Sequence, residues 1–186
     1  MPSCERIILG CGWLGKPLAI SLISKGFLVK GSTTSEEKLK WLADENIIPF
    51  LVDISQEEIS KDFLDASVLI IAITSKNESD FKRLISQIEK ANIQKVIFIS
   101  STSVYPSLNK IMTENDATQE HPLAIIENLF RENTHFKTTI IRFSGLIGGV
   151  RHPANWFQNG RKIPQPNGFV NMIHLTDCIA IIEKII

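Results

Sequence analysis

The sequence has no excess of charge of either sign, since 20 lysine and arginine residues balance 20 aspartate and glutamate residues among 186. A chain without net charge has no overall field that draws it to nucleic acid or to an anionic membrane, and we expect neither partner. The sequence also has no apolar run approaching the roughly 20 residues that a membrane-spanning helix needs. Residues 1–6 run directly into a strand-like segment without the pattern of a signal peptide, so we expect a cytoplasmic protein.

Residues that build disulfides and metal centres are also scarce. Three cysteines are an odd number at unrelated spacings, which favours reduced thiols over a disulfide framework. The four histidines and the cysteines show no metal-ligand spacing, so we expect no metal site. These residues are Cys4, Cys11, Cys178, His121, His135, His152 and His174.

Short apolar runs alternate with longer amphipathic runs, which is the pattern of a parallel sheet covered by helices. We predict one α/β domain over residues 1–186, a three-layer sandwich with a mainly parallel sheet in Rossmann order and a reduced C-terminal substrate region at about 145–186. The expected strands are 6–9, 27–31, 47–52, 68–73, 95–100, 138–143 and 170–173. The expected helices are 14–24, 34–43, a short one from 55, 80–91, 123–133 and one from 176 to the end.

Several residues predict where these elements lie or begin. The run at 68–73 is the most apolar and is predicted to be central, whereas Pro49 places the strand at 47–52 near a sheet edge. Capping-box spacings at 34–37 and 55–58 predict helix starts there, and Thr176 is predicted to cap the last helix.

The glycine pattern at 10–15 stands directly after an expected strand and opens an expected helix, which is where a dinucleotide-binding turn needs it. Gly10 would permit the tight turn, Gly12 would let the backbone approach a pyrophosphate, and Gly15 would allow close helix–strand packing. The free N–H groups of the helix would then attract the phosphates. The alternative is a glycine-rich connection without a ligand. The predicted cofactor-binding residues of this turn are Gly10, Cys11, Gly12, Trp13, Leu14 and Gly15.

Two side chains in this turn have alternative interpretations. Cys11 lies near a helix N-terminus that would lower its pKa, or it is simply small enough to fit. Trp13 either packs in the fold or shields the pyrophosphate.

The end of the second expected strand carries hydroxyl groups and no acid, although NAD-selective sites place Asp or Glu there. Hydroxyls and a nearby lysine could bind a 2′-phosphate, so NADP is slightly favoured over NAD. Alternatively, these residues only cap the next helix. Asp53 would contact the adenine or serve as a plain turn residue. The predicted cofactor set is completed by Ser32, Thr33, Thr34, Lys38, Asp53 and Ala72.

Four motifs together resemble the extended and atypical short-chain dehydrogenase/reductase superfamily, and most closely its NAD(P)-dependent epimerase/dehydratase branch, the nucleoside-diphosphate-sugar epimerases. The motifs are Ile-Leu-Gly-Cys-Gly-Trp-Leu-Gly at 8–15, Phe-Ile-Ser-Ser-Thr-Ser-Val-Tyr at 98–105, Arg-Phe-Ser-Gly-Leu-Ile-Gly at 142–148 and Asn-Met-Ile-His-Leu-Thr-Asp at 171–177. The glycine spacing points to the atypical subgroup.

The resemblance implies a hydroxyl after the fifth strand, followed by a Tyr acid/base and a Lys one helical turn later. Ser101 matches the hydroxyl position and is the predicted catalytic residue. When Pro122 and Glu132 are matched to the family's Pro-x-Tyr-x-x-x-Lys-x-x-x-Glu pattern, Ala124 stands at the Tyr position and Asn128 at the Lys position. Neither can transfer the proton.

The remaining tyrosine does not replace this pair. Tyr105 is the only tyrosine of the chain, and Lys110 follows it at the wrong spacing.

Two arginines are candidates for binding an anionic substrate group. Alternatively, Arg142 forms a salt bridge at the sheet edge and Arg151 is solvated. Thr102 joins them as a predicted substrate residue. His174 and Asp177 are predicted to cap and orient the last helix rather than form a catalytic pair.

The sequence therefore leads to two functional hypotheses and a weaker third. The first is an NAD(P)-dependent oxidoreductase or epimerase-like enzyme acting on a small substrate, with sugar nucleotides as a candidate class. The second is a non-catalytic dinucleotide sensor or partner-binding module, and the third is a degenerate protein that binds little. Apolar residues at 181–186 make a homodimer a candidate assembly.

Overall fold

The computed structural model describes residues 5–56, 58–108, 110–157, 162 and 167–186. The chain forms two compact units, Met1–Arg142 and Phe143–Ile186. The cysteine at position 4 and the glutamate at position 57 of the second capping-box pattern lie outside the described residues. The proposal that residues 145–186 form a substrate region remains a prediction.

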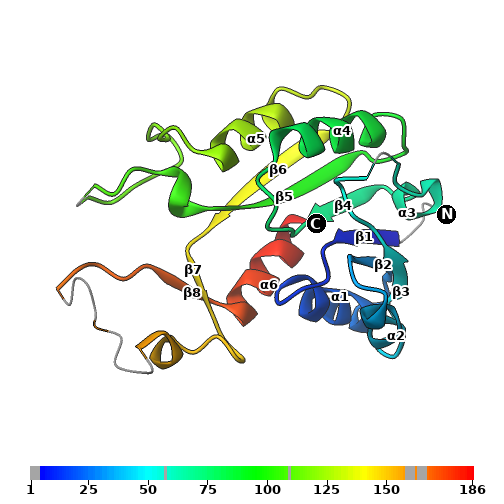
Figure 1. Ribbon diagram of the computed structural model, residues 1–186, viewed down its shortest axis with the longest axis horizontal. Coiled ribbons are helices and arrows are strands. Elements are labelled where there is room, and N and C mark those ends of the chain that lie inside the picture. Colours follow the sequence, from blue (N-terminus) through cyan, green and yellow to red (C-terminus); the bar gives the residue numbers. More distant parts are fainter. Residues whose placement is uncertain (1–4, 57, 109, 158–161, 163–166) are drawn as a thin grey trace. The chain divides into compact units, whose positions relative to one another are not determined.

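The first unit is built on a six-stranded sheet in the order β3-β2-β1-β4-β5-β6, which is the predicted Rossmann order (Figure 1). The pairs β1–β2, β1–β4, β2–β3 and β4–β5 are parallel. The predicted α/β fold class is confirmed. The strands are β1 (Glu5–Leu9), β2 (Leu28–Thr33), β3 (Ile48–Leu51), β4 (Val68–Ile71), β5 (Lys95–Ser101) and β6 (Lys137–Phe143).

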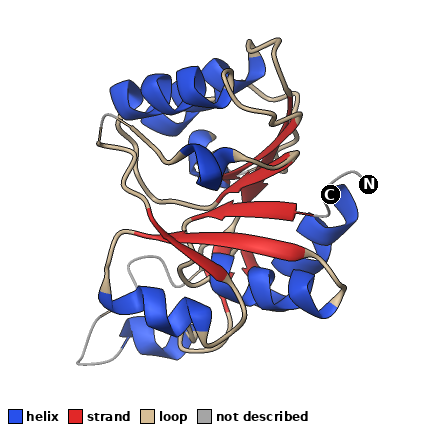
Figure 2. Ribbon diagram, turned by 90° about the vertical axis from the view of Figure 1, so that its right-hand side faces the viewer, coloured by secondary structure: helices blue, strands red, loops and turns tan. Residues whose placement is uncertain are grey.

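Helices cover both faces of this sheet and give the unit its three layers (Figure 2). Figure 1 shows α4 and α5 on one face and α1 and α2 on the other. The helices of this unit are α1 (Gly15–Ser24), α2 (Glu37–Ala43), α3 (Lys61–Leu64), α4 (Glu78–Ile88), η1 (Thr102–Val104, a 3-10 turn) and α5 (Pro122–Arg131).

Buried aliphatic strands and a group of phenylalanines form the core of the first unit. All four residues of β4 are buried, which confirms its predicted central position. Under α4 and α5, Phe98 stacks on Phe130 with ring centroids 5.0 Å apart, and Phe81 meets the edge of Phe98 at 5.7 Å. Pro49 lies on β3 at the edge of the sheet, as predicted, where a missing backbone N–H is tolerated.

Three helix starts differ from the predictions, and for α3 and α4 a local side-chain hydrogen bond is the reason. No side chain caps α2, which begins at Glu37, so the first predicted capping box does not form. The second also fails, because the Ser55 N–H donates to Asp53 Oδ1 and folds the chain into a turn, and α3 begins only at Lys61. In contrast, α4 begins earlier than predicted, because Asn77 Oδ1 accepts from two backbone N–H groups of its first turn.

The second unit contains a short parallel strand pair and a helix. Strand β7 (Gly145–Ile147) pairs with β8 (Met172–His174), followed by α6 (Leu175–Ile185); residues 153–157 form the 3-10 turn η2 (Pro153–Phe157). The predicted strand at 170–173 is therefore shifted, and β7 was not predicted because three residues show no periodicity. The cap of α6 is His174, whose Nδ1 accepts from the Thr176 N–H, so Thr176 is not the cap.

No helix in the described ranges is long and apolar enough to cross a membrane.

Candidate dinucleotide site

Two glycines of the turn between β1 and α1 are required by the protein's own packing. Gly10 has φ +98°, and a Cβ there would fall 2.6 Å from Ile73 Cγ2 and 2.8 Å from the Ala72 carbonyl oxygen. A Cβ on Gly15 would collide with the Gly10 carbonyl oxygen, because the helix packs directly against the turn. Any larger residue at either position would force the backbone apart.

Gly12 differs from these two glycines, because a Cβ there would meet no atom within 4 Å. Packing within the protein therefore does not explain a glycine at this position. Gly12 lines a cavity of about 500 Å³, so the missing side chain leaves backbone open to whatever enters. This is the arrangement that a pyrophosphate needs for close approach.

The N-terminus of α1 adds a favourable field at the same place. Its N-cap is Leu14, which makes no side-chain cap hydrogen bond, and the first turn of the helix holds no acidic residue. The partial positive charge of the helix end therefore has no protein carboxylate on its first turn to offset it.

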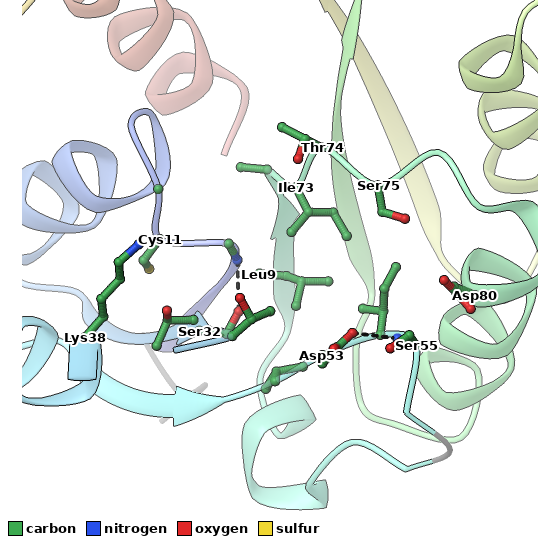
Figure 3. Close-up of a pocket in the computed structure, with 17 residues that line it drawn as sticks. Leu9, Cys11, Ser32, Lys38, Asp53, Ser55, Ile73, Thr74, Ser75 and Asp80 are labelled. Carbon is green, nitrogen blue, oxygen red and sulfur yellow. Dashed lines mark hydrogen bonds between the residues drawn. The ribbon is translucent and has the colours of Figure 1, made fainter. Parts of the chain in front are cut away.

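The cavity lies at the carboxyl ends of the strands around β1, β2 and β4, where the strand order reverses (Figure 3). It contains nine of the predicted cofactor residues: Gly10, Cys11, Gly12, Ser32, Thr33, Thr34, Lys38, Asp53 and Ala72. Trp13, Leu14 and Gly15 are not among its lining residues. Prediction missed Leu9, Val52, Ile54, Ser55, Ile73, Thr74, Ser75 and Asp80. The pair at 74–75 could have been found, because hydroxyls that directly follow a central strand lie at this edge.

Ser32 of β2 holds the glycine turn in place through two hydrogen bonds from the backbone of the turn. It is 1% exposed, its Oγ accepts from the Gly10 N–H at 2.9 Å, and its carbonyl oxygen accepts from the Cys11 N–H at 2.7 Å. These two bonds hold the first half of the glycine turn against β2, and Figure 3 shows the one to the Ser32 hydroxyl. Ser32 was predicted as a cofactor contact, and its visible role is to position the turn.

Cys11 is packed rather than activated. It is 4% exposed, and burial raises the pKa of its thiol to about 12. The interpretation that the helix N-terminus lowers this pKa is therefore wrong, because loss of hydration outweighs the one lowering contribution, a hydrogen bond with the Ser32 backbone. The alternative interpretation, a small residue that fits, describes its environment.

Asp53 is an exposed carboxylate at the cavity, two residues after β3. Its pKa is lowered because the Ser55 backbone N–H and side chain both donate to it. The hydrogen bond to the Ser55 N–H is 2.9 Å long, so the side chain both shapes the turn and presents a negative charge.

Ser101 is the last residue of β5 and Thr102 begins the 3-10 turn η1, and neither lines this cavity. The Ser101 Oγ accepts from the Ser103 N–H at 3.1 Å and caps the short turn that follows. Both side chains are partly exposed. Their predicted catalytic and substrate roles remain predictions.

A buried ionic network that the sequence analysis missed connects β5, β6 and α5. Glu127 is 0% exposed; it accepts from Ser100 Oγ at 2.5 Å and from the Arg142 guanidinium at 2.6 to 3.1 Å. Arg142 also donates to the Tyr105 hydroxyl at 2.5 Å, and Glu127 raises its already high pKa further. The salt-bridge alternative for Arg142 is thus what the fold shows. A lone acid in the apolar helix and a lone arginine in an apolar strand were the available signals.

Arg151 belongs to the second unit, where its backbone pairs with Gly148 and its side chain is exposed. Its predicted contact with substrate remains a prediction. Among the residues that the structure describes, no group of three or more His, Cys, Asp or Glu side chains could hold a metal ion.

Residues 7–126 match the family described as the NAD binding domain of 6-phosphogluconate dehydrogenase. The chain belongs to this family of NAD-binding domains. The match begins in β1, contains the glycine turn and the whole cavity, and ends within α5.

Comparison with individual proteins extends the likeness over nearly the whole chain. Protein YeeZ of Escherichia coli (strain K12) is 29% identical over an alignment of 199 positions. The alignment covers 96% of this chain and 72% of YeeZ. A functionally unknown conserved protein from Silicibacter pomeroyi DSS has a TM-score of 0.81 at 20% identity, over 96% of this chain and 66% of that one. The UDP-Glc/GlcNAc 4-epimerase of Campylobacter jejuni has a TM-score of 0.75 at 14% identity, over 95% and 72%. The chain thus spans about two thirds to three quarters of these relatives' length.

These findings confirm the predicted resemblance at the level of fold and cofactor. The chain is an NAD(P)-binding protein that is epimerase/dehydratase-like in architecture.

The α5 helix of this NAD-binding domain departs from the reductase pattern in either possible register. Glu132, matched to the motif's glutamate in the sequence, is exposed, while the buried glutamate of this helix is Glu127. When Glu132 is matched to the motif's glutamate, the residue at the Tyr position, Ala124, is buried and the residue at the Lys position, Asn128, is exposed. Matching Glu127 instead would place Gln119 and Leu123 at the Tyr and Lys positions. Neither register supplies the proton-transferring pair.

Proposed function

We propose that the first unit binds its nicotinamide dinucleotide in the 500 Å³ cavity, with the pyrophosphate over Gly12 and the N-terminus of α1. The observation that carries this proposal is the open space at Gly12, between two glycines that packing does require. The residues present fit the cofactor: open backbone, an uncapped helix end and polar groups at the strand ends. When bound, the nicotinamide would supply hydride transfer.

The test compares Gly12→Ala and Gly12→Val with the wild-type chain by fluorescence titration of NADPH and NADH. Because a Cβ at position 12 meets no protein atom within 4 Å, we expect both variants to keep the wild-type melting temperature. We expect the valine variant to bind at least about tenfold more weakly, because its branched side chain occupies the pyrophosphate approach. Ser24→Val, at the exposed far end of α1, is the matched control and should bind normally. Unchanged affinity of Gly12→Val would show that the turn is not the site.

We further propose that the protein is an oxidoreductase or epimerase-like enzyme acting on a small substrate, with sugar nucleotides as the first class to test. The fold likeness to the UDP-Glc/GlcNAc 4-epimerase supports this class. Ser101, partly exposed at the end of β5, would orient a substrate hydroxyl, and Thr102 would lie beside it. Loss of turnover in Ser101→Ala, without loss of cofactor affinity, would support this role. Unchanged turnover in that variant would remove Ser101 from the mechanism.

A second candidate function, a non-catalytic dinucleotide sensor, is favoured by one observation on α5. Ala124 is buried and Asn128 is exposed, where the reductase pattern has its Tyr and Lys. Dinucleotide binding without turnover of any tested sugar nucleotide would favour the sensor. Failure to bind either dinucleotide at near-millimolar concentration would favour the degenerate protein instead.

The homodimer and the cytoplasmic location also remain predictions. Sedimentation of the purified chain with and without NADPH would test the first, and fractionation of cells expressing the tagged chain would test the second.

A further inference from the structure

The end of β2 is where a Rossmann domain distinguishes NAD from NADP. A carboxylate there accepts hydrogen bonds from the ribose 2′-OH of NAD and repels the 2′-phosphate of NADP. Here β2 ends at Thr33, and Thr34 and Ser35 follow. The next acidic residues, Glu36 and Glu37, are not among the residues that line the cavity.

The hydroxyls at this strand end are not equivalent. Ser32 is almost completely buried and holds the Gly10 N–H, so it supports the turn. The Thr33 Oγ1 accepts from the Ser35 N–H at 3.2 Å and shapes the chain before α2. Thr34 is exposed and lines the cavity. Of the three hydroxyls, Thr34 is therefore the one best placed to meet a ligand.

Lys38 is the one cation among the described residues that line the cavity. It is exposed on α2, and its side chain extends from the helix toward the glycine turn (Figure 3). The buried lysines of this unit are neutralised, since Lys16 pairs with Glu45 and Lys30 with Glu5, each at 2.9 Å. Within the described part of the chain, no carboxylate lies within 4.0 Å of the Lys38 ammonium.

We propose that Lys38 and Thr34 bind the 2′-phosphate of NADP(H), and that Lys38 sets the preference for this dinucleotide. The inference rests on the proposed function of the same cavity. A phosphate at this strand end would receive a charge-assisted hydrogen bond from the ammonium and a second one from the hydroxyl.

The cavity also contains two carboxylates, and neighbours hold each of them. Asp53 accepts from the Ser55 N–H at 2.9 Å, and it follows β3 rather than β2. Asp80 is 9% exposed and pairs with Arg83 at 3.5 Å. Asp53→Asn tests whether the first carboxylate opposes the phosphate, and we expect its affinity for NADPH to be equal to or higher than that of the wild type.

The experiment titrates NADPH and NADH into the wild-type chain, Lys38→Ala and the control Lys40→Ala. Lys40 is exposed on the same short helix but does not line the cavity, so the control removes the same charge away from the site. We expect the wild type to prefer NADPH, and Lys38→Ala to lose about tenfold or more of its NADPH affinity with NADH affinity unchanged. Lys40→Ala should match the wild type for both. Added salt should narrow the difference between NADPH and NADH, because an exposed ion pair is screened.

The outcomes separate this inference from the proposed function. If neither dinucleotide binds the wild type, the proposed site fails and this inference fails with it. If both bind the wild type equally, or if Lys38→Ala weakens both equally, the site stands and the role of Lys38 is overturned. Ser32→Ala provides the contrast, because losing the support of the turn should weaken both dinucleotides to the same degree.

Discussion

Replacing Glu127 with glutamine should destabilise the protein more than any exposed substitution on the same helix. The carboxylate is completely buried and lies against a guanidinium whose side chain is 13% exposed. Glutamine keeps the size of the side chain and removes its charge. The largely buried Arg142 then keeps its positive charge without a carboxylate to neutralise it, and only neutral acceptors remain, the glutamine amide oxygen and the Tyr105 hydroxyl.

The expected loss follows from what happens when one partner of a buried ion pair is removed. Such changes cost about 3–5 kcal/mol, because the remaining charge stays desolvated without compensation. For a domain of this size, each kcal/mol lowers the melting temperature by about 2–4 °C, so the expected decrease is about 6–20 °C. Glu132→Gln at the exposed end of α5 removes the same charge and should change the free energy of unfolding by no more than about 0.5 kcal/mol.

Urea unfolding followed by circular dichroism would measure both variants, with the slope of the transition checked for constancy. Arg142→Met alone and the double variant Glu127→Gln with Arg142→Met complete a double-mutant cycle. If the uncompensated charge is the cause, removing it should restore a substantial part of the lost stability, because an apolar replacement of a buried ion pair is often neutral. A Glu127→Gln loss as small as that of Glu132→Gln, or a strictly additive double variant, would refute the reasoning.

Three further predictions follow from the described geometry. Gly15→Ala should cost about 3 kcal/mol or more in urea unfolding because the methyl group collides with backbone, whereas Gly12→Ala should cost little. Cys11 should resist alkylation in the folded protein at pH 8 and react after unfolding, as mapped by mass spectrometry, because its pKa is raised to about 12. Asp116, whose pKa a hydrogen bond from Lys110 lowers to about 2, should titrate there by NMR and return towards its ordinary value of about 3.9 in Lys110→Met. Its contribution to stability is present above that ordinary value and is lost as the pH falls through about 2; an unshifted titration in the wild type would contradict the described contact.

The first half of the fold was predictable because its signals are local and regular. The central strand, the edge strand with Pro49 and the glycine turn follow from burial, backbone chemistry and spacing. The helix starts at 34–37 and 55–58 were predicted wrongly, and the reason for the second is also local. The Asp53 side chain bonds the Ser55 N–H, and that turn competes with the helix that the capping pattern predicts.

The candidate site was predictable in part, because the carboxyl ends of parallel strands bring residues from distant segments to one edge. The sequence identified the glycine turn after β1, the hydroxyl run at the end of β2, Asp53 after β3 and Ala72 after β4. It missed Thr74 and Ser75 in the same loop, because their only signal was their position after a central strand and not a distinctive spacing.

The sequence by itself determined that a glycine turn joins a strand to a helix, and that no tyrosine and lysine stand at the reductase positions of the later helix. Only the tertiary structure decided what the individual side chains do. It showed that Gly12 faces open space while Gly15 faces backbone, that Ser32 supports the turn, and that Glu127 neutralises Arg142. The physical reason is that spacing reports periodicity along one segment, whereas space and charge at a position depend on atoms far away in the chain.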